Sequence, residues 1–279
     1  MDVDLITLEL KLAFEKPGCP ICRLRHTAGQ RYLRSLLWEN VNDGGTRVHL
    51  VRALGFCYAH AWQLQQMEKS MWHDGLGTGI IYEDLATRAL AGLKAYMRTQ
   101  DRAMARRRRW RRWRKWIATA LCRWFSQPAS LTSDPPLPPG LIPRDRCRVC
   151  ELEENSEETH VAWLVKGCAE PRFQRWYQAS DGLCLPHLRR ALALAEREDP
   201  AVALFLARTC QEKLARLTMQ LREYIRKHAW EYRDEPKLPE EQSSWVRTVA
   251  FFAGERRETR GEMQEPFGNE SWAKEVIET

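Results

Sequence analysis

The feature that most constrains this 279-residue chain is a pair of cysteine and histidine motifs that occurs twice. The C-x-x-C motif Cys19–Cys22 is followed, after 34 residues, by the C-x-x-H motif Cys57–His60. Cys147–Cys150 and Cys184–His187 repeat the two motifs in the same order, with 33 residues between them. The copies are offset by 128 and 127 residues, and this agreement in type, order and spacing predicts an internal duplication.

The eight side chains of these motifs are predicted to bind metal. Thiolates and imidazoles are the ligands that suit Zn²⁺ or an iron–sulfur centre, whereas Ca²⁺ and Mg²⁺ require oxygen. Four filled positions favour a structural ion, because catalytic zinc keeps one position open. We therefore expect two zinc ions, with a [4Fe–4S]-type cluster that has one histidine ligand as the alternative. The expected Cys₃His sets, one within each copy, are Cys19, Cys22, Cys57 and His60, and Cys147, Cys150, Cys184 and His187.

The spacing within each motif indicates that the ligands stand at helix starts. Residues three apart lie on one face of a helix, so both can reach one ion. Pro17-Gly18 and Gly55 interrupt the chain just before two of the motifs. A helix N-terminus would also stabilise thiolates through its free N–H groups and its dipole. In the first copy, the two helices would be joined by a loop over Glu39–Thr46.

Apolar residues recur at helical intervals around both copies, and no sustained alternating strand pattern occurs. The expected fold class is all-α, built from two pseudo-repeated helical units that are each clamped by a Cys₃His site. A long helix is expected from Tyr82 to Phe125, and Asp199-Pro200 is expected to cap and open another. The expected helices carry their apolar stripes over residues 24–37, 57–71, 82–97, 161–164, 188–195 and 210–224.

Six prolines between Ser126 and Pro143 forbid a packed helix there and predict an exposed linker. The expected organisation is a first repeat over residues 1–125, a linker over 126–143, a second repeat over 144–236 and a C-terminal segment over 237–279. In that last segment, a short helix over Trp245–Phe252 is expected to end at Gly254, before a polar tail.

The formal net charge of +7 is concentrated in Arg106–Trp116, which alone carries +8. Its tryptophans recur every three residues among the arginines, which suits contact with an anionic membrane surface. Binding to nucleic-acid phosphates with stacked tryptophans is a weaker alternative, and the plainest interpretation is tryptophans packed on the body with solvated arginines. The candidate contact residues are Arg107, Arg108, Trp110, Arg111, Trp113, Arg114 and Trp116.

No apolar run approaches the roughly 20 residues that a membrane span needs. The acidic start of the chain lacks the positive region of a secretory signal, so a cytoplasmic location is expected, with a peripheral position at the inner membrane surface as an alternative. The sequence also lacks the common nucleotide-binding and hydrolase motifs, which argues against an enzyme.

Several cysteine, histidine and glutamate side chains lie outside the predicted ligand sets, and a structural role is expected for most of them. Cys168 is expected in a loop, as an inert boundary residue or a reactive thiol, and Cys210 is expected in the core. His160 is expected at a packed position. A cluster of carboxylates is expected on a solvated helix face; its members are Glu151, Glu153, Glu154, Glu157 and Glu158.

Several blocks resemble an uncharacterised prokaryotic domain-of-unknown-function family with tandem C-P-x-C and C-x-x-H motifs. They include Gly18–Cys22, Arg31–Leu33, Ile81–Leu85, Asp181–Leu188 and Ser244-Trp245. The resemblance implies a helical metal-binding body and no particular activity. Arg148 departs from the proline expected in the second C-P-x-C motif.

Together these observations predict a non-enzymatic, zinc-binding helical protein that acts as an interaction or scaffold module with an unknown protein partner. An iron–sulfur redox protein or metal sensor that uses the same ligands is the first alternative. A peripheral membrane or nucleic-acid-binding protein that acts through Arg106–Trp116 is the second.

Overall fold

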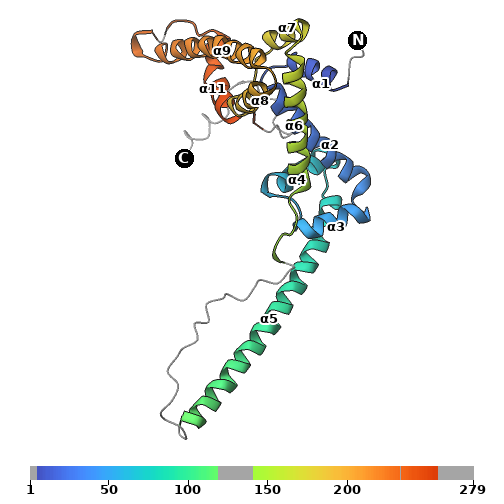
Figure 1. The fold of residues 1–279 in the computed structure, drawn as a ribbon. Helices are drawn as coiled ribbons and strands as arrows, with labels where there is room; N and C mark the ends of the chain where they lie inside the picture. Colours follow the sequence, from blue (N-terminus) through green and yellow to red (C-terminus); the bar gives the residue numbers. More distant parts are fainter. Residues whose placement is uncertain (1–4, 119–140, 233, 257–279) are drawn as a thin grey trace. The chain divides into compact units, whose positions relative to one another are not determined.

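The computed structural model describes residues 5–118, 141–232 and 234–256. Every regular element in these ranges is helical, so the predicted all-α class is confirmed for the described part of the chain (Figure 1). None of the described helices combines the length and the apolar composition that crossing a membrane would require.

Contacts divide the chain into two compact units. One combines residues 1–34 with 149–279, and the other is residues 35–148. The two units are defined by contacts in the structure, whereas the repeats were predicted from motif spacing in the sequence. The division does not test the repeat boundaries, which stay a prediction.

The first unit is built around one continuous apolar core. Leu10, Ile21, Leu164 and Leu206, from four different helices, are fully buried in it. Full burial of such a side chain contributes about 1.5–3 kcal/mol. The principal helices of this unit are α1 (Leu5–Phe14), α2 (Pro20–Ser35, of which all but the last residue belongs here), α6 (Arg148–Gly167, of which all but the first residue belongs here), α7 (Pro171–Ala179), α8 (Leu185–Glu198), α9 (Pro200–Arg226) and α11 (Ser244–Ala253).

Aromatic contacts join α1 to α7, and neither helix was expected from the apolar pattern. The rings of Phe14 and Phe173 meet edge to face with centroids 5.4 Å apart. Gly167 ends α6 where a side chain would come within 2.8 Å of the Phe173 ring, so this close turn requires glycine.

Helices α8 and α9 form a hairpin at Asp199. Its carboxylate accepts a hydrogen bond from the backbone N–H of Ala201 at 2.9 Å, and Pro200 opens α9. The predicted cap and first-turn proline are therefore confirmed. The start of α8 positions two of the predicted metal ligands.

The second unit contains η1 (Leu36–Asn40), α3 (Gly44–Ala53), α4 (Tyr58–Trp72) and α5 (Leu76–Ala118). The loop expected over Glu39–Thr46 is wrong in extent, because α3 already begins at Gly44. Asp43 starts this helix early, since its carboxylate accepts a hydrogen bond from the Thr46 N–H at 2.7 Å.

Helix α5 is a single long helix, as predicted, although it begins six residues before Tyr82 (Figure 1). The buried Glu68 of α4 accepts hydrogen bonds from the backbone N–H groups of Gly77 and Thr78, at 2.5 and 2.8 Å. It thereby satisfies two of the free donors at the helix start and fixes where α5 begins.

Parts of several predictions lie outside the described residues. These parts are the end of the long helix after Ala118, the linker up to Gly140 and the polar tail from residue 257. The predicted short C-terminal helix is confirmed as α11, and Gly254 ends it with a φ of +86°.

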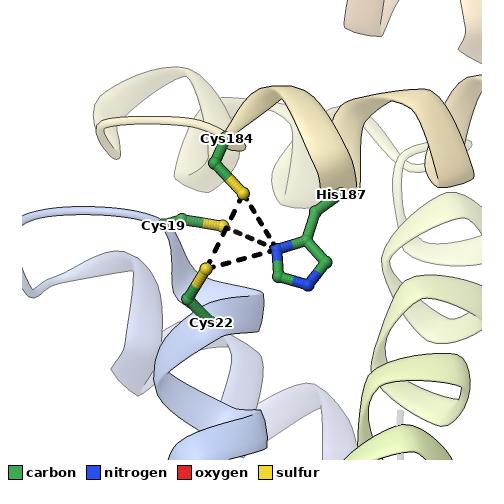
Figure 2. A group of neighbouring side chains, drawn as sticks. All are labelled: Cys19, Cys22, Cys184 and His187. Carbon is green, nitrogen blue, oxygen red and sulfur yellow. Dashed lines mark hydrogen bonds between the residues drawn. The ribbon is translucent and has the colours of Figure 1, made fainter. Parts of the chain in front are cut away.

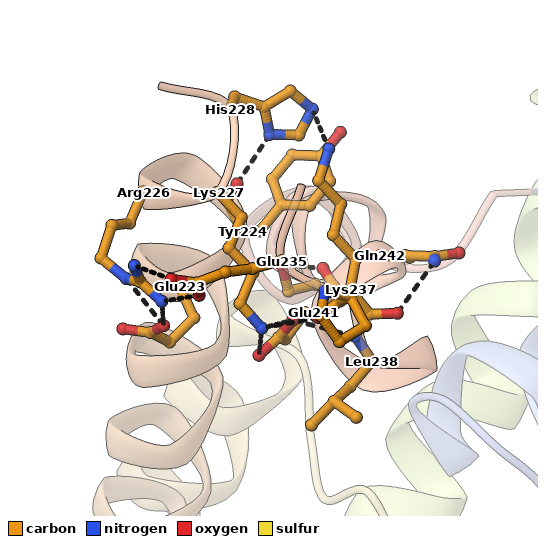
Figure 3. A network of polar contacts seen from close by, with 12 residues as sticks. Glu223, Tyr224, Arg226, Lys227, His228, Glu235, Lys237, Leu238, Glu241 and Gln242 are labelled. Carbon is orange, nitrogen blue, oxygen red and sulfur yellow. Dashed lines mark hydrogen bonds and ion pairs between the residues drawn. The ribbon is translucent and has the colours of Figure 1, made fainter. Parts of the chain in front are cut away.

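A polar network ties the end of α9 to the short helix α10 (Pro239–Gln242), which leads into α11 (Figure 3). At its centre is a buried ion pair, in which Lys227 Nζ lies 2.7 and 2.9 Å from the two carboxylate oxygens of Glu241. Glu241 also accepts a hydrogen bond from the Leu238 N–H at 2.9 Å. These hydrogen bonds from Lys227 and Leu238 lower the pKa of Glu241.

We predict that Lys227→Met lowers the melting temperature at pH 7, because it leaves the Glu241 carboxylate buried without its cation. A carboxyl whose pKa is lower in the folded state than in the unfolded state stabilises the fold at pH values above its unfolded pKa. This contribution is lost as the pH falls through the folded pKa. The difference from wild type should therefore shrink in acid, as measured by thermal unfolding from pH 7 to pH 3. Adding Glu241→Gln should restore part of the loss; a double variant less stable than the single one would contradict this role.

Candidate metal centres

The two C-x-x-H motifs have the same local geometry. Cys57 and Cys184 are the N-cap residues of α4 and α8, so each histidine lies in the first turn of its helix. The Sγ atom of each cysteine lies 3.1 Å from Nδ1 of the histidine three residues later. Gly55 and Gly182 precede them with φ values of +90° and +84°, which favour glycine and turn the chain into each helix.

The C-x-x-C motifs also stand at helix starts, as predicted. Cys19 directly precedes α2 and Cys147 directly precedes α6, and the second cysteine of each motif lies in the first helical turn. Gly18, with a φ of +88°, turns the chain into α2. Arg148, at the position where a proline was expected, is compatible with the same arrangement, because α6 begins at this residue.

The structure brings all eight predicted ligands into two groups of four, but it pairs the motifs differently from our prediction. The expectation that each copy closes its own set is wrong: the first C-x-x-C motif meets the second C-x-x-H motif, and the first C-x-x-H motif meets the second C-x-x-C motif. The groups, within which all ligand atoms lie within 4.8 Å of one another, are Cys19, Cys22, Cys184 and His187, and Cys57, His60, Cys147 and Cys150.

Contacts made by α6 in the first unit explain the exchange. Glu157, in the middle of α6, contacts Arg25 near the start of α2 and also His187 in the first turn of α8. Helices α2 and α8 therefore begin beside the same turn of α6. Spacing along the chain specifies which residues can ligate, but it does not specify which motifs meet.

In the first group, the three sulfurs surround one ring nitrogen (Figure 2). Nδ1 of His187 lies 3.4 Å from the Sγ atoms of Cys19 and Cys22, and 3.1 Å from that of Cys184. The Sγ atoms of Cys22 and Cys184 are 3.7 Å apart. All four residues are buried.

These spacings suit a single tetrahedral ion. With metal–sulfur bonds of about 2.3 Å and a metal–nitrogen bond of about 2.0 Å, tetrahedral geometry separates two sulfurs by about 3.8 Å and sulfur from nitrogen by about 3.5 Å. The sulfur–nitrogen distances of 3.1 and 3.4 Å and the sulfur–sulfur distance of 3.7 Å in the first group are all shorter than these values, by about 0.4 Å at most. The four ligands therefore fit one ion with no position left open.

The segment after α11 covers the first group, which the sequence did not suggest. The backbone N–H of Glu255 donates to Cys22 Sγ at 3.3 Å, and its carboxylate accepts a hydrogen bond from the Cys19 N–H at 3.1 Å. A side chain at Gly254 would lie 3.4 Å from Cys22 Sγ. The donated N–H offsets part of the negative charge that three thiolates bring to the site.

Glu157 orients the histidine of the first group. Its carboxylate lies 3.2 Å from Nε2 of His187, and also binds Arg190 at 2.9 Å and Arg25 at 3.1 Å. Because Nδ1 faces the three sulfurs, the ring proton belongs on Nε2, where Glu157 accepts it. A buried carboxylate behind a ligating histidine is a common arrangement that fixes ring orientation and strengthens the ligand.

The side chains around His187 and Glu157 shift the pKa values of the two groups in opposite directions. Burial alone would lower the pKa of His187, but hydrogen bonds to Cys184, Cys19, Cys22 and Glu157 raise it well above its usual value. Burial alone would likewise raise the pKa of Glu157, whereas its bond to His187 and the nearby arginines hold it below the usual range. The carboxylate therefore stays charged while it supports the ring.

The second group is built from the same motifs and is less shielded from water. Nδ1 of His60 lies 3.1 Å from Cys57 Sγ and 3.5 Å from Cys147 Sγ. His60 is fully buried, but the three cysteines of this group are partly exposed. A chelator should therefore remove a metal ion from the second group faster than from the first.

Two of the carboxylates expected on a solvated face are buried instead. Glu153 and Glu157 are 1% and 2% exposed, because Arg25 lies against both of them. The prediction failed because the charge that pairs them comes from α2, far away in the sequence. Two carboxylates four residues apart on a helix give no signal in the sequence of such a distant partner.

The remaining candidates are resolved individually. Cys168 is fully buried, and burial raises its pKa to about 12, which favours the inert residue over the reactive thiol. Cys210 packs partly buried against the core, near its predicted place. His160 is packed as expected, and its Nε2 lies 3.2 Å from the carboxylate of Glu9.

The basic tryptophan segment lies on α5, where every side chain from Asp101 to Trp110 is exposed. Arg107 and Arg108 are among them, and 57% of Trp110 is accessible to solvent. The interpretation that the tryptophans pack against the body is therefore wrong for Trp110. The helix continues through Arg111, Trp113, Arg114 and Trp116, whose side chains lie outside the described part.

Comparison with known proteins identifies one family. The model of a family of unknown function, DUF6062, matches residues 1–259. No curated protein and no solved structure matches the chain. The match covers all eight ligands and extends over α11.

We predict that Glu157→Gln weakens metal binding at the first group by about 10-fold, because the amide can still accept the proton of His187 but carries no charge. Competition with a chromophoric chelator measures this affinity. The control is Glu158→Gln, which changes the exposed neighbour of Glu157 and should leave the affinity unchanged. Equal affinities of the two variants would contradict the role of Glu157.

Proposed function

We propose that this chain, which belongs to the DUF6062 family of unknown function, is a non-enzymatic helical protein that binds two zinc ions and acts as an interaction or scaffold module. The observation that carries the proposal is the closed set of three sulfurs and one nitrogen around a common centre. A structural ion in such a set contributes to the folding free energy, on the order of 10 kcal/mol in small zinc domains.

The distances favour one zinc ion per group over an iron–sulfur cluster. A cluster places each ligand on a different iron atom, at separate corners of a body that itself occupies several ångströms. The ligand atoms here converge within 4.8 Å of one another, as they do around a single ion. Sulfur with one imidazole is a common structural zinc set, and its thiolates suit a reducing compartment such as the cytoplasm.

The donor set also supports a structural rather than a catalytic role. Catalytic zinc keeps a coordination position for water or substrate, whereas the four protein ligands of each group would fill all the positions of a tetrahedral ion. The ligands of the first group come from the starts of α2 and α8, two helices separated by more than 100 residues of sequence. An ion there would hold distant helices together, which is the role of a scaffold.

A second candidate function rests on α5. A continuous helix presents consecutive exposed arginines from Arg106 to Arg109, followed by the exposed Trp110. Basic side chains beside an aromatic ring suit an anionic membrane surface, where each cation contributes about 1 kcal/mol. We propose such a surface as the partner of this segment, with the protein at the inner face of the membrane.

We predict that purified protein is colourless and contains two zinc ions per chain by elemental analysis. Removing them with a chelator should lower the melting temperature markedly, because the ions stabilise the folded state. Cys57→Ser should lose one ion, whereas Cys210→Ser, a cysteine outside both groups, should keep two. Broad absorption near 400 nm with bound iron would favour the cluster, and unchanged melting after chelation would contradict a structural metal.

We also predict that the protein sediments with vesicles containing phosphatidylserine and not with phosphatidylcholine vesicles. Binding should weaken as salt rises, and Arg107→Glu with Arg108→Glu should weaken it more than 10-fold. Arg208→Glu with Arg222→Glu, two exposed arginines on α9, is the matched control. Stronger binding to DNA or RNA than to anionic vesicles would assign the segment to nucleic acid instead.

A further inference from the structure

A cavity of about 450 Å³ lies in the first unit beside the first metal group. Ligand pockets in proteins commonly enclose roughly 300–1,000 Å³, so this cavity has room for a small organic molecule. Its walls are one face of α9, one face of α11, and the two loops that carry Cys19 and Cys184. The scaffold role proposed above does not involve this cavity.

One side of the cavity is apolar. Leu214 and Leu217 are one helical turn apart on α9, and both line it. Ala250 and Phe251 of α11 line it as well, and Phe251 is only partly buried. These side chains offer a surface for hydrocarbon or an aromatic ring, from which water would be displaced.

Three cationic side chains reach the same cavity. Lys213 and Arg216 lie three residues apart on α9, and therefore on one face of the helix, while Arg247 comes from α11. Arg216 makes no ion pair with any residue in the described ranges. Partial burial lowers the pKa of Lys213, Asp181 partly offsets this, and Arg216 adds its repulsion. An anion bound here would relieve that repulsion.

Arg247 has a donor with no acceptor. Its Nη2 donates to the side chain of Gln220 at 2.9 Å and to the Glu240 carbonyl at 2.5 Å. Its Nε is shielded from solvent and has no hydrogen-bond partner among the described residues. Leaving a buried charged donor unsatisfied is costly. Because this Nε is shielded, a ligand in the cavity would bind the outer nitrogens of the guanidinium.

The two carboxylates in the wall of the cavity are engaged elsewhere. Asp181 accepts a hydrogen bond from the Gly18 N–H at 2.7 Å, and Glu255 accepts one from the Cys19 N–H at 3.1 Å. Neither forms an ion pair with Lys213, Arg216 or Arg247 in the described structure. Lys213 Nζ donates to the carbonyls of Gln178 and Ser180, at 2.7 and 2.5 Å, and keeps one further N–H group. Arg216 is therefore the main cation available to an external anion, with Lys213 and Arg247 beside it.

We propose that this cavity binds a small organic anion with an apolar body. Its acid group lies beside Lys213, Arg216 and Arg247, and its apolar part lies against Leu214, Leu217 and Phe251. Charge-assisted hydrogen bonds from guanidinium and ammonium groups bind the carboxylate or phosphate, and the leucines and the phenylalanine select for the hydrocarbon.

Calorimetric titration of the metal-loaded full-length protein with sodium octanoate tests the proposal, with octan-1-ol as the uncharged partner of the same length. Octanoate should bind saturably with one molecule per chain, and at least 10-fold more tightly than octanol. Absence of saturable octanoate binding, or equal binding of the two compounds, would overturn the proposal.

Two variants locate the site. Arg216→Glu should weaken octanoate binding by at least 10-fold, and Arg208→Glu, an exposed arginine on the same helix outside the cavity, should not. Ala250→Phe should fill the apolar side of the cavity and weaken the binding of both octanoate and octanol. Each variant should retain its metal content, which shows that it is folded. Octanoate binding that survives both Arg216→Glu and Ala250→Phe would place the ligand elsewhere and overturn the assignment.

Discussion

The exchange of motifs between the two metal groups is the constraint on which the rest of the structure depends. A set closed within one copy would hold together only neighbouring helices, such as the pair that begins at Cys19 and Cys57. The structure instead joins the C-x-x-C motif at Cys19 to the C-x-x-H motif at Cys184. One ion would therefore close the chain between Cys22 and Cys184, and the other the shorter stretch between His60 and Cys147. A cross-link over a longer loop restricts the unfolded chain more.

The polar groups around the first metal group stabilise its buried ligands and orient them. A buried set of three thiolates requires nearby positive charge and hydrogen-bond donors, because an isolated buried charge is costly. Glu157 orients His187 and is itself held by Arg25 and Arg190. The backbone N–H of Glu255 donates a hydrogen bond to Cys22 Sγ. Helices α2, α6, α8 and α11 are thus connected through one small centre.

Much of this could be predicted from the sequence. Ligand identity, the helix starts at the motifs, the cap at Asp199 and the end of α11 at Gly254 follow from local patterns, since each depends on neighbouring residues. The pairing of motifs, the burial of Glu157 and the cover from Glu255 could not be predicted, because their partners are distant in the sequence. Helices α1, α3 and α7 were also missed; they are short, and α1 and α7 are held by tertiary contacts such as Phe14 on Phe173.

The most direct test of the crossed arrangement is the metal content of two double variants. Cys22→Ser with Cys184→Ser removes two ligands from one group as the structure pairs them, so one ion per chain should remain. Cys22→Ser with Cys57→Ser damages both groups, so neither ion should be retained at full occupancy. The opposite result, with an ion retained only in the Cys22/Cys57 variant, would restore pairing within each copy and contradict this account.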